Sequence, residues 1–329
     1  MNYVKSLIFR SGKIRVGITL GDPAGIGPQI LSDAFRQIGK LKGVEFIVIG
    51  DRKVLNKFNF PYNKVTFLDL DNVSLKEFSF GKINPHYGRA AVEYIDKAIE
   101  LIKNKEIDCL VTLPITKTSV SKGGFCWPGH TEYLAEIFGV KGVVMMLMNR
   151  YVRVSLVTRH LAIKDVASEL TKEKIYNTII LTYEGLKNWF GIRRPKIAVC
   201  ALNPHASDGG MFGNEEEKLI IPAINEVRNK IKDITIFGPL ASDALFFKAK
   251  ERIYNAIIAM YHDQAMIALK LLDFFHGVNI TLGLPFVRTS PLHGSALDMA
   301  GKRKASCLPL IEAIQSAIRC TLYKRRGSF

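Results

Sequence analysis

The chain has 329 residues, of which 46 are Lys or Arg and 30 are Asp or Glu, so its formal net charge at pH 7 is +16. Its hydrophobic share of 48% and charged share of 23% are typical of folded globular proteins and exclude wholesale disorder and a collagen-like or coiled-coil class. The length predicts two domains, and the charge favours anionic partners: nucleic acid, a membrane surface, or small phosphorylated or carboxylated molecules.

Strand-like and helix-like segments alternate along the chain from the N-terminus onward. The strand-like segments are short apolar runs, and the helix-like segments carry apolar residues three and four positions apart. This alternation predicts an α/β protein with a mixed, largely parallel sheet flanked by helices. The predicted strands are residues 16–20, 44–50, 108–113, 142–148, 154–157, 196–202, 256–260 and 278–282, and the predicted helices are residues 88–105, 171–190, 215–231 and 308–323.

Membrane, secretory and nucleic-acid classes have little support in the sequence. No stretch reaches the roughly 18 apolar residues of a membrane span, and the N-terminus has no apolar core followed by a small-residue cleavage site. The five cysteines are widely spaced and include no CxxC pair, which fits the reducing cytoplasm. No run of five basic residues and no zinc-finger spacing accompanies the charge, so we expect no specific nucleic-acid partner and no membrane partner.

A glycine-rich segment, residues 21–28 (GDPAGIGP), follows the first predicted strand and precedes a helix. It lacks the Gly-Lys-Ser/Thr of a phosphate-binding P-loop, and the dinucleotide pattern GxGxxG does not align with it. Two interpretations remain open: a tight strand-to-helix turn, or a loop that lets a ligand approach the backbone.

Three of the seven histidines follow predicted strands: His160, His205 and His262. Ligands of open α/β sheets bind at the carboxyl ends of strands, so three imidazoles placed there could converge on one metal ion. Three protein nitrogens with one open position form the ligand set of a catalytic zinc-type site. The sequence therefore predicts a metal site, with ordinary core or surface histidines as the alternative.

A further polar cluster lies toward the C-terminus and contains Lys270, Asn279, Arg288 and the loop 293–302. Lys and Arg can bind phosphate or carboxylate groups. Taken singly, each of these cations could equally be a solvated surface charge.

Together these segments resemble the 4-hydroxythreonine-4-phosphate dehydrogenase family of pyridoxal phosphate synthesis, from about residue 16 to about residue 306. The resemblance rests on ITLGDPAGIGPQI (18–30), YGRAAVEYI (87–95), LVTLPITK (110–117), GHTEYLA (129–135), VTRHLAIKDV (157–166), NPHASDGGMFGNEE (203–216), GPLASDALF (238–246), YHDQAMIALK (261–270) and RTSPLHGSALDMAGK (288–302). The last segment is also similar to the cofactor loop of isopropylmalate and isocitrate dehydrogenases. The sequence departs from the family pattern at Gln29, Leu297 and residues 206–208, and none of these positions is an expected ligand.

The resemblance implies a two-domain isocitrate/isopropylmalate dehydrogenase-like fold. Residues 1–128 plus 275–329 would form a first α/β domain with the NAD-binding loop, and residues 129–274 a second α/β domain with the metal ligands and dimer contacts. The site would be completed at a homodimer interface. The implied residues are His160, His205 and His262 for the metal; His130, Thr131, Lys270, Asn279 and Arg288 for the substrate; His293, Gly294, Ser295 and Asp298 for the cofactor.

The implied reaction is the oxidation of 4-phosphooxy-L-threonine by NAD, with NADP left open, and the loss of CO2 to give 3-amino-2-oxopropyl phosphate. One divalent ion (zinc, magnesium or cobalt) would act as the Lewis acid. Lys270, Asp243 and a metal-bound water are the candidate proton acceptors. The alternatives are a related dehydrogenase of D-erythronate or D-threonate 4-phosphate, and a three-histidine metal hydrolase that needs no nicotinamide.

Overall fold

The computed structural model describes residues 12–127, 129–302 and 305–327. The chain forms two compact units, the first made of residues 1–139 and 284–329 and the second of residues 140–283. These boundaries lie after residues 139 and 283, whereas the sequence analysis placed them after residues 128 and 274. Helix α6 (His130–Ile137) therefore belongs to the first unit, where Tyr133 donates a hydrogen bond to Asp96 of helix α4 (Pro85–Lys103). Strand β10 (Val278–Leu282) belongs to the second unit, where it pairs with strand β5.

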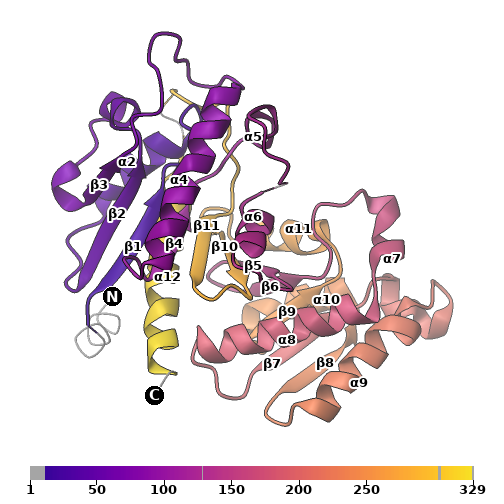
Figure 1. The fold of residues 1–329 in the computed structure, drawn as a ribbon. Helices are drawn as coiled ribbons and strands as arrows, with labels where there is room; N and C mark the ends of the chain where they lie inside the picture. Colours follow the sequence, from indigo (N-terminus) through magenta and orange to yellow (C-terminus); the bar gives the residue numbers. More distant parts are fainter. Residues whose placement is uncertain (1–11, 128, 303–304, 328–329) are drawn as a thin grey trace. The chain divides into compact units, whose positions relative to one another are not determined.

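The first unit contains a parallel sheet with the strand order β3-β2-β1-β4-β11 (Figure 1). In-register pairs such as Ile14↔Val44 and Val16↔Cys109 join the central strands. Their nearly continuous apolar sequence is typical of parallel strands that are buried on both faces. The strands are β1 (Ile14–Thr19), β2 (Val44–Gly50), β3 (Thr66–Asp69), β4 (Cys109–Thr112) and β11 (Val287–Pro291).

Helices pack against this sheet and are defined by local sequence signals. Helix α4 begins with Pro85 in its first turn, and the Asn84 side chain caps it by accepting a hydrogen bond from the His86 amide at 2.8 Å. Its apolar face packs against β1, β2 and β4, while α12 packs against β1, β4 and β11. The helices of this unit are α2 (Gly27–Gln37), α3 (Arg52–Leu55), α4 (Pro85–Lys103), α5 (Lys117–Lys122), α6 (His130–Ile137) and α12 (Leu308–Arg326), with short 3-10 turns at Asn56–Phe58 and Tyr62–Lys64.

The second unit contains a mixed sheet with the strand order β10-β5-β6-β9-β7-β8. Strand β5 is antiparallel to both β10 and β6, and the pairs from β6 to β8 are parallel. The strands are β5 (Val144–Met148), β6 (Arg153–Leu156), β7 (Lys196–Cys200), β8 (Thr235–Leu240), β9 (Ala256–Ala259) and β10 (Val278–Leu282). The α-helices are α7 (Val166–Glu169), α8 (Lys172–Asn188), α9 (Ile221–Lys230), α10 (Ser242–Lys248) and α11 (His262–Leu272); a π turn (Glu216–Ile220) precedes α9, and 3-10 turns lie at Ile163–Asp165, Pro204–Gly210 and Ala249–Glu251.

The predicted fold class, a mixed and largely parallel sheet flanked by helices, is confirmed. Every predicted strand and helix has a counterpart, with ends that shift by a few residues. Strands β3, β8 and β11 were not predicted. Strand β3 lies at the edge of the sheet and is largely accessible, and β11 (VRTSP) is too polar to stand out as a buried strand.

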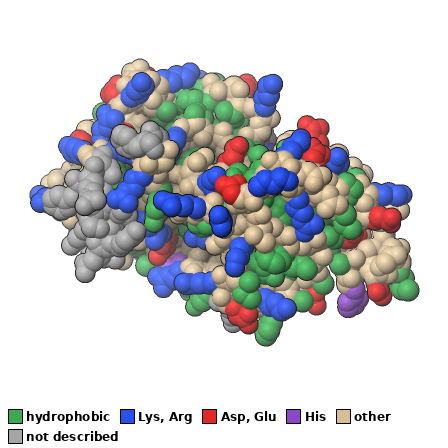
Figure 2. Space-filling view, turned by 90° about the horizontal axis from the view of Figure 1, so that it is seen from below, with side chains coloured by type: hydrophobic (Ala, Val, Ile, Leu, Met, Phe, Trp, Pro, Cys, Tyr) green, Lys and Arg blue, Asp and Glu red, His purple; other side chains and the backbone are tan. Residues whose placement is uncertain are grey.

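Charged side chains are dispersed over the surface. Figure 2 shows Lys and Arg spread over the face in view, with Asp and Glu between them. Several cations form exposed ion pairs, such as Lys13 with Glu45 and Lys172 with Glu226. In the described part of the chain, no helix has the length and apolar character needed to cross a bilayer.

Candidate functional site

Three loops meet at the carboxyl ends of β1, β4 and β11 in the first unit. The Asp22 amide donates to the Pro114 carbonyl at 2.9 Å, and the Ile26 amide donates to the Ser295 carbonyl at 3.0 Å. The Thr116 hydroxyl donates to the Ser295 hydroxyl at 2.9 Å. This edge of a parallel sheet is where ligands of open α/β folds bind.

The glycine-rich segment forms the close contacts between these loops. Gly21 has φ of +71°, and a Cβ there would lie 2.4 Å from the Pro114 carbonyl oxygen. A Cβ on Gly25 would lie 3.0 Å from the Ser295 carbonyl oxygen. Residue 21 therefore requires glycine for the packing of the loops themselves, and a side chain in place of Gly25 would be tight against Ser295. The segment is a tight strand-to-helix turn, and its approach to a ligand stays a prediction.

Asp22 is a completely buried carboxyl group within this turn. Its Oδ1 accepts a hydrogen bond from the Ala24 amide at 2.9 Å. Burial raises the pKa of Asp22, and the nearby Thr116 side chain and the hydrogen bond from the Ala24 amide oppose that rise. Asp22 and Thr116 were not predicted as site residues. The sequence feature that could have identified Asp22 was its position after the first glycine of the segment, where an Asp side chain can hydrogen-bond to the backbone two residues on.

Arg288, on β11, is a buried cation with a fixed orientation. Its side chain is 2% exposed, and both Nη2 and Nε donate to the Thr112 hydroxyl on β4, at 2.6 and 3.2 Å. Burial lowers its pKa to about 10, and the charge of Glu132 opposes this shift. The guanidinium group is therefore still protonated at neutral pH. Thr112, which sets its orientation, was not predicted.

His130, the first residue of α6, is neutral at physiological pH. Burial, and secondarily the charge of Arg288, lower its pKa well below the usual range. Its Nε2 is buried and has no hydrogen-bond partner among the described residues. Thr131 beside it is also buried. An unsatisfied imidazole nitrogen close to a buried cation is a suitable place for a polar ligand.

His293 lies in the loop after β11, and burial lowers its pKa as well. Its Nδ1 lies 3.0 Å from the Gly294 carbonyl oxygen, so Nδ1 carries the proton and donates a hydrogen bond to this oxygen. The other nitrogen, Nε2, is then a hydrogen-bond acceptor, and it is buried without a partner among the described residues. Asp298, farther along the loop, has an exposed carboxylate, and its carbonyl accepts from Lys302.

In the second unit, two of the predicted metal ligands lie together. His160 follows β6, His262 begins α11 directly after β9, and β6 and β9 are parallel neighbours. Their ring centroids are 5.3 Å apart. His262 Nδ1 lies 3.0 Å from the carboxylate of Asp263, which orients the ring.

His205 lies on a loop of unusual backbone conformation after β7. The residues from His205 to Asp208 have φ between +43° and +72°, a region that residues with side chains rarely occupy. Glu216 fixes the start of the loop, because its Oε1 accepts hydrogen bonds from the amides of Leu202 and Asn203 at 2.8 Å each. The His205 side chain is exposed. Among residues 12–127, 129–302 and 305–327, no three His, Cys, Asp or Glu side chains are grouped so that they could hold a metal.

The remaining predicted residues of this unit are dispersed over three elements. Lys270, exposed in the last turn of α11, has its Nζ 5.8 Å from the Phe274 ring centroid. Asp243 is exposed in the first turn of α10, and Asn279 on β10 has a buried Oδ1 without a partner in the described segments. Gln264 was not predicted; it donates to the Ala201 carbonyl and the Ser242 hydroxyl and accepts from the Met260 amide. The sequence feature that could have identified Gln264 was its position two residues after His262.

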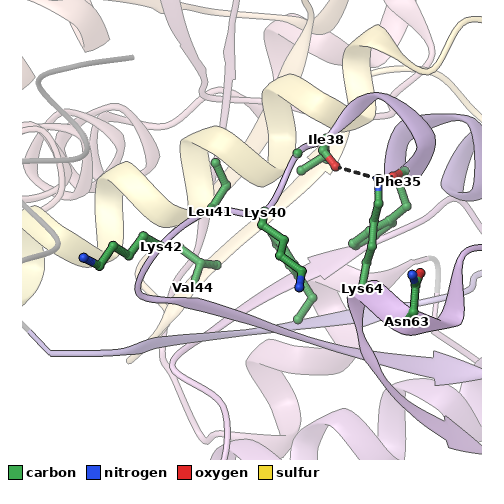
Figure 3. Close-up of a pocket in the computed structure, with 10 residues that line it drawn as sticks. Phe35, Ile38, Lys40, Leu41, Lys42, Val44, Asn63 and Lys64 are labelled. Atoms are coloured by element: carbon green, nitrogen blue, oxygen red, sulfur yellow. Dashed lines mark hydrogen bonds between the residues drawn. The ribbon is translucent and has the colours of Figure 1, made fainter.

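A hollow of about 410 Å³ in the first unit contains none of the predicted site residues. It lies where α2 ends and β2 begins, and Figure 3 shows the Lys64 side chain directed at backbone oxygens of α2. Lys64 Nζ donates to the carbonyls of Phe35 and Ile38 at 2.6 and 3.1 Å. This lysine therefore caps the carboxyl end of the helix, a role that needs no ligand.

Comparison with known proteins assigns the chain to a family. The family model described as pyridoxal phosphate biosynthetic protein PdxA matches residues 29–317. The 4-hydroxythreonine-4-phosphate dehydrogenase of Sulfurihydrogenibium sp. (strain YO3AOP1) is 41% identical, over 93% of this chain and 98% of that protein. A protein of Oceanobacillus iheyensis, provisionally named D-threonate 4-phosphate dehydrogenase, is 38% identical over 94% of this chain and 98% of its own length.

A solved structure agrees with these sequence matches. The crystal structure of 4-hydroxythreonine-4-phosphate dehydrogenase from Klebsiella pneumoniae is 30% identical and superposes with a TM-score of 0.83, covering 94% of this chain and 98% of that one. The family model and the relatives span nearly the same part of the chain, which includes both units. The chain therefore belongs to the PdxA family of pyridoxal phosphate biosynthetic proteins.

Proposed function

We propose that the chain is an NAD-dependent 4-hydroxythreonine-4-phosphate dehydrogenase of the cytoplasm. It would oxidise 4-phosphooxy-L-threonine, and the oxidised product would lose CO2 to give 3-amino-2-oxopropyl phosphate, a step toward pyridoxine 5'-phosphate. The observation that carries this proposal is the family match together with a full-length relative of that name. The buried pair of Arg288 and His130 supports it, because a phosphorylated acid needs a fixed cation beside neutral hydrogen-bonding groups.

We propose that His130, Thr131, Lys270, Asn279 and Arg288 hold the substrate. Arg288 offers a guanidinium group oriented by Thr112, and its charge acts on His130. His130 and Thr131 offer buried neutral polar atoms. Lys270 and Asn279 would bind a second anionic or polar part of the substrate. Fixing the substrate at both ends holds the reacting carbon in place, which lowers the entropic part of the barrier. Lys270 and Asp243 are the side chains that we propose as proton acceptors.

The loops of the first unit fit a nicotinamide cofactor. Gly25 brings backbone next to Ser295, and the buried His293 Nε2 is an acceptor that a donor group of a dinucleotide would satisfy. We therefore propose that His293, Gly294, Ser295 and Asp298 line the NAD pocket, with NADP also compatible. When bound, the nicotinamide supplies the hydride acceptor.

The histidines of the second unit fit two of three ligands of a divalent metal such as zinc, magnesium or cobalt. His160 and His262 lie side by side, and Asp263 orients His262. His205 is exposed on a separate loop, and we infer that a second copy of the chain completes the ligand set. When bound, the metal supplies a Lewis acid that lowers the pKa of the substrate hydroxyl.

The test is a substrate panel that is followed by NADH formation. Purified protein with added zinc, magnesium or cobalt should reduce NAD with 4-phosphooxy-L-threonine, and the CO2 released should equal the NADH formed. The control is 4-hydroxy-L-threonine, which differs from the substrate only in lacking the phosphoryl group. Absence of NADH with all three metals would contradict the proposal.

A related dehydrogenase of four-carbon sugar-acid phosphates is a second candidate, favoured by the name of the Oceanobacillus iheyensis relative. The panel therefore includes D-threonate and D-erythronate 4-phosphate, which carry a hydroxyl in place of the amine. A higher kcat/KM with either compound than with 4-phosphooxy-L-threonine would favour this candidate. Hydrolysis of a substrate without any NADH would instead indicate a metal hydrolase.

A further inference from the structure

Helix α6 carries two of the residues proposed to bind the substrate, His130 and Thr131, at its first two positions, and both are buried. The helix has eight residues, which is too few for a stable isolated helix in water. Its N-cap is Gly129, which has no side chain that could accept a hydrogen bond from the first amides of the helix. The placement of α6 therefore depends on contacts with the rest of the first unit.

One such contact joins α6 to helix α4. The Tyr133 hydroxyl donates a hydrogen bond to the carboxylate of Asp96, and Tyr133 is buried. Burial raises the pKa of Asp96, and the hydrogen bond from Tyr133 opposes that rise. A hydrogen bond to a charged, partly buried acceptor is costly to break, so this contact fixes the middle of α6 on α4.

A second contact joins α6 to the segment that precedes it. Trp127 Nε1 donates to Glu136 Oε2 at 2.7 Å, so an indole from before the helix reaches its last turn. The ring centroids of Trp127 and Tyr133 are 4.3 Å apart. Tyr133 and Glu136 are three residues apart and lie on one face of α6, which the indole covers. We call the contacts of Trp127 with Tyr133 and Glu136 the indole clamp.

The segment that carries Trp127 is also anchored at its other end, through helix α5. A Cβ on Gly88 of α4 would lie 2.1 Å from the Ser119 carbonyl oxygen of α5, so the two helices are in close contact. Thr116, the N-cap of α5, donates to the Ser295 hydroxyl in the proposed cofactor loop. Helix α5 is thus fixed on α4 independently of the indole clamp, and we expect the clamp to affect α6 and not the cofactor loop.

We propose that Trp127 is a positioning residue for substrate binding, which sets the direction of α6 and thereby the places of His130 and Thr131. The first turn of α6 and the guanidinium group of Arg288 influence each other, since the charge of Arg288 acts on His130 and that of Glu132 acts on Arg288. A small shift of α6 therefore changes how these groups meet a ligand together. This inference rests on the proposed function, because it assigns His130 and Thr131 to the substrate.

The test compares substrate binding with stability in variants of the full-length protein. Trp127→Phe keeps a ring against Tyr133 but removes the N–H donor, and Glu136→Ala removes the acceptor. Both should raise KM and the calorimetric Kd for 4-phosphooxy-L-threonine about three- to tenfold. The values of kcat and of KM for NAD should stay unchanged, and Tm should fall by a few degrees at most.

Two further variants separate positioning from a general loss of structure. Glu136→Gln keeps an oxygen acceptor and should bind substrate like the wild type. Combining Trp127→Phe with Glu136→Ala should weaken binding no more than either change alone, because both break the same hydrogen bond. If Trp127→Phe does not fold, Glu136→Ala, at an exposed position, carries the comparison with Glu136→Gln.

The matched control is Glu106→Ala, which also removes an exposed carboxylate that accepts from a neutral side chain, Asn104 Nδ2 at 3.0 Å. It should leave KM and Kd unchanged. The proposal is overturned if Trp127→Phe and Glu136→Ala bind substrate like the wild type, or if Glu106→Ala weakens binding as much as they do. A lower Tm with unchanged KM would likewise reduce the clamp to a structural contact.

Failure of the proposed function is distinguishable from failure of this inference. If the wild type forms no NADH from 4-phosphooxy-L-threonine, the same Kd comparison is made with D-threonate 4-phosphate. Hydrogen–deuterium exchange adds a measurement that needs no substrate: the amides of residues 133–138, which bond within α6, should exchange faster in Trp127→Phe and not in Glu106→Ala. Unchanged exchange in Trp127→Phe overturns the clamp whatever the activity.

Discussion

At the scale of single residues, the candidate site combines a charged Arg288 with a neutral His130, and burial has opposite consequences for their charges. The guanidinium pKa is lowered only to about 10, so Arg288 keeps its charge at neutral pH. The imidazole begins from a much lower pKa, so the same environment removes its charge. Burial therefore gives one cation and one neutral hydrogen-bonding group side by side.

The neutral His130 leads to a pH prediction for stability. Its pKa is lowered in the folded protein, so its contribution is complete above the pKa of the unfolded chain, near 6.5, and decreases as the pH falls below that value. The loss approaches about 1.4 kcal/mol per pH unit. His130→Gln should reduce the fall in unfolding free energy between pH 7 and pH 5, measured by urea denaturation. His86→Gln, at an exposed position on α4, should not; equal slopes for wild type and His130→Gln would refute the assignment.

At the scale of elements, the loop 203–213 depends on a neighbouring helical turn. Glu216 is 3% exposed, and it accepts from two backbone amides that would otherwise lack partners. Burial tends to raise its pKa, but the hydrogen bonds from Asn203 and Leu202 outweigh burial and lower it. Its stabilising contribution is therefore present above about pH 4.5 and is lost as the pH falls through the lowered pKa.

Removing this carboxylate should release the loop that carries His205. We expect Glu216→Ala to reduce the unfolding free energy by about 2–3 kcal/mol, since two buried donors lose a charged acceptor. Zinc affinity, measured by calorimetry, should also fall if His205 is a ligand, as it should in His205→Ala without a comparable loss of stability. Glu217→Ala, at the exposed next position, is the control. Unchanged zinc binding in both the Glu216 and the His205 variants would remove the loop from the metal site.

At the scale of the whole molecule, an apolar surface on α11 and the turn after it supports a homodimer. Ile267 and Leu271 lie one helical turn apart and are 63% and 83% exposed, and Phe274 and Phe275 follow with 61% and 53%. Contiguous apolar surface of this kind marks interaction sites more often than it marks solvent-facing helices. The same helix begins with His262, so an interface here would bring a second copy close to the proposed metal ligands.

The dimer can be tested by sedimentation. We expect twice the chain mass of 36.8 kDa for the wild type, and a monomer without dehydrogenase activity for Leu271→Glu combined with Phe275→Glu. Leu75→Glu, at another exposed apolar position, should stay dimeric and active. A fully active monomer would contradict a site shared between two copies.

The fold class, and the placement of three histidines after strands, could be predicted from the amino-acid sequence alone. Buried parallel strands need continuous apolar runs, and helices need apolar residues at spacings of three and four, so both patterns are readable locally. The positions of His160, His205 and His262 after strands could be predicted because the strands before them are such apolar runs. The family resemblance, confirmed by the family match, supplied the expected reaction.

Other features depend on groups that are far apart in the chain and come together only on folding. Burial and the nearby Arg288 make His130 neutral; Thr112 orients Arg288 from a position 176 residues away. No local sequence pattern predicts the contacts of Ser295 with Thr116 and with residues 22–26. The same is true of the unit boundaries after residues 139 and 283. A pKa and a hydrogen bond depend on distance and solvent exposure in three dimensions, and a short sequence window fixes neither.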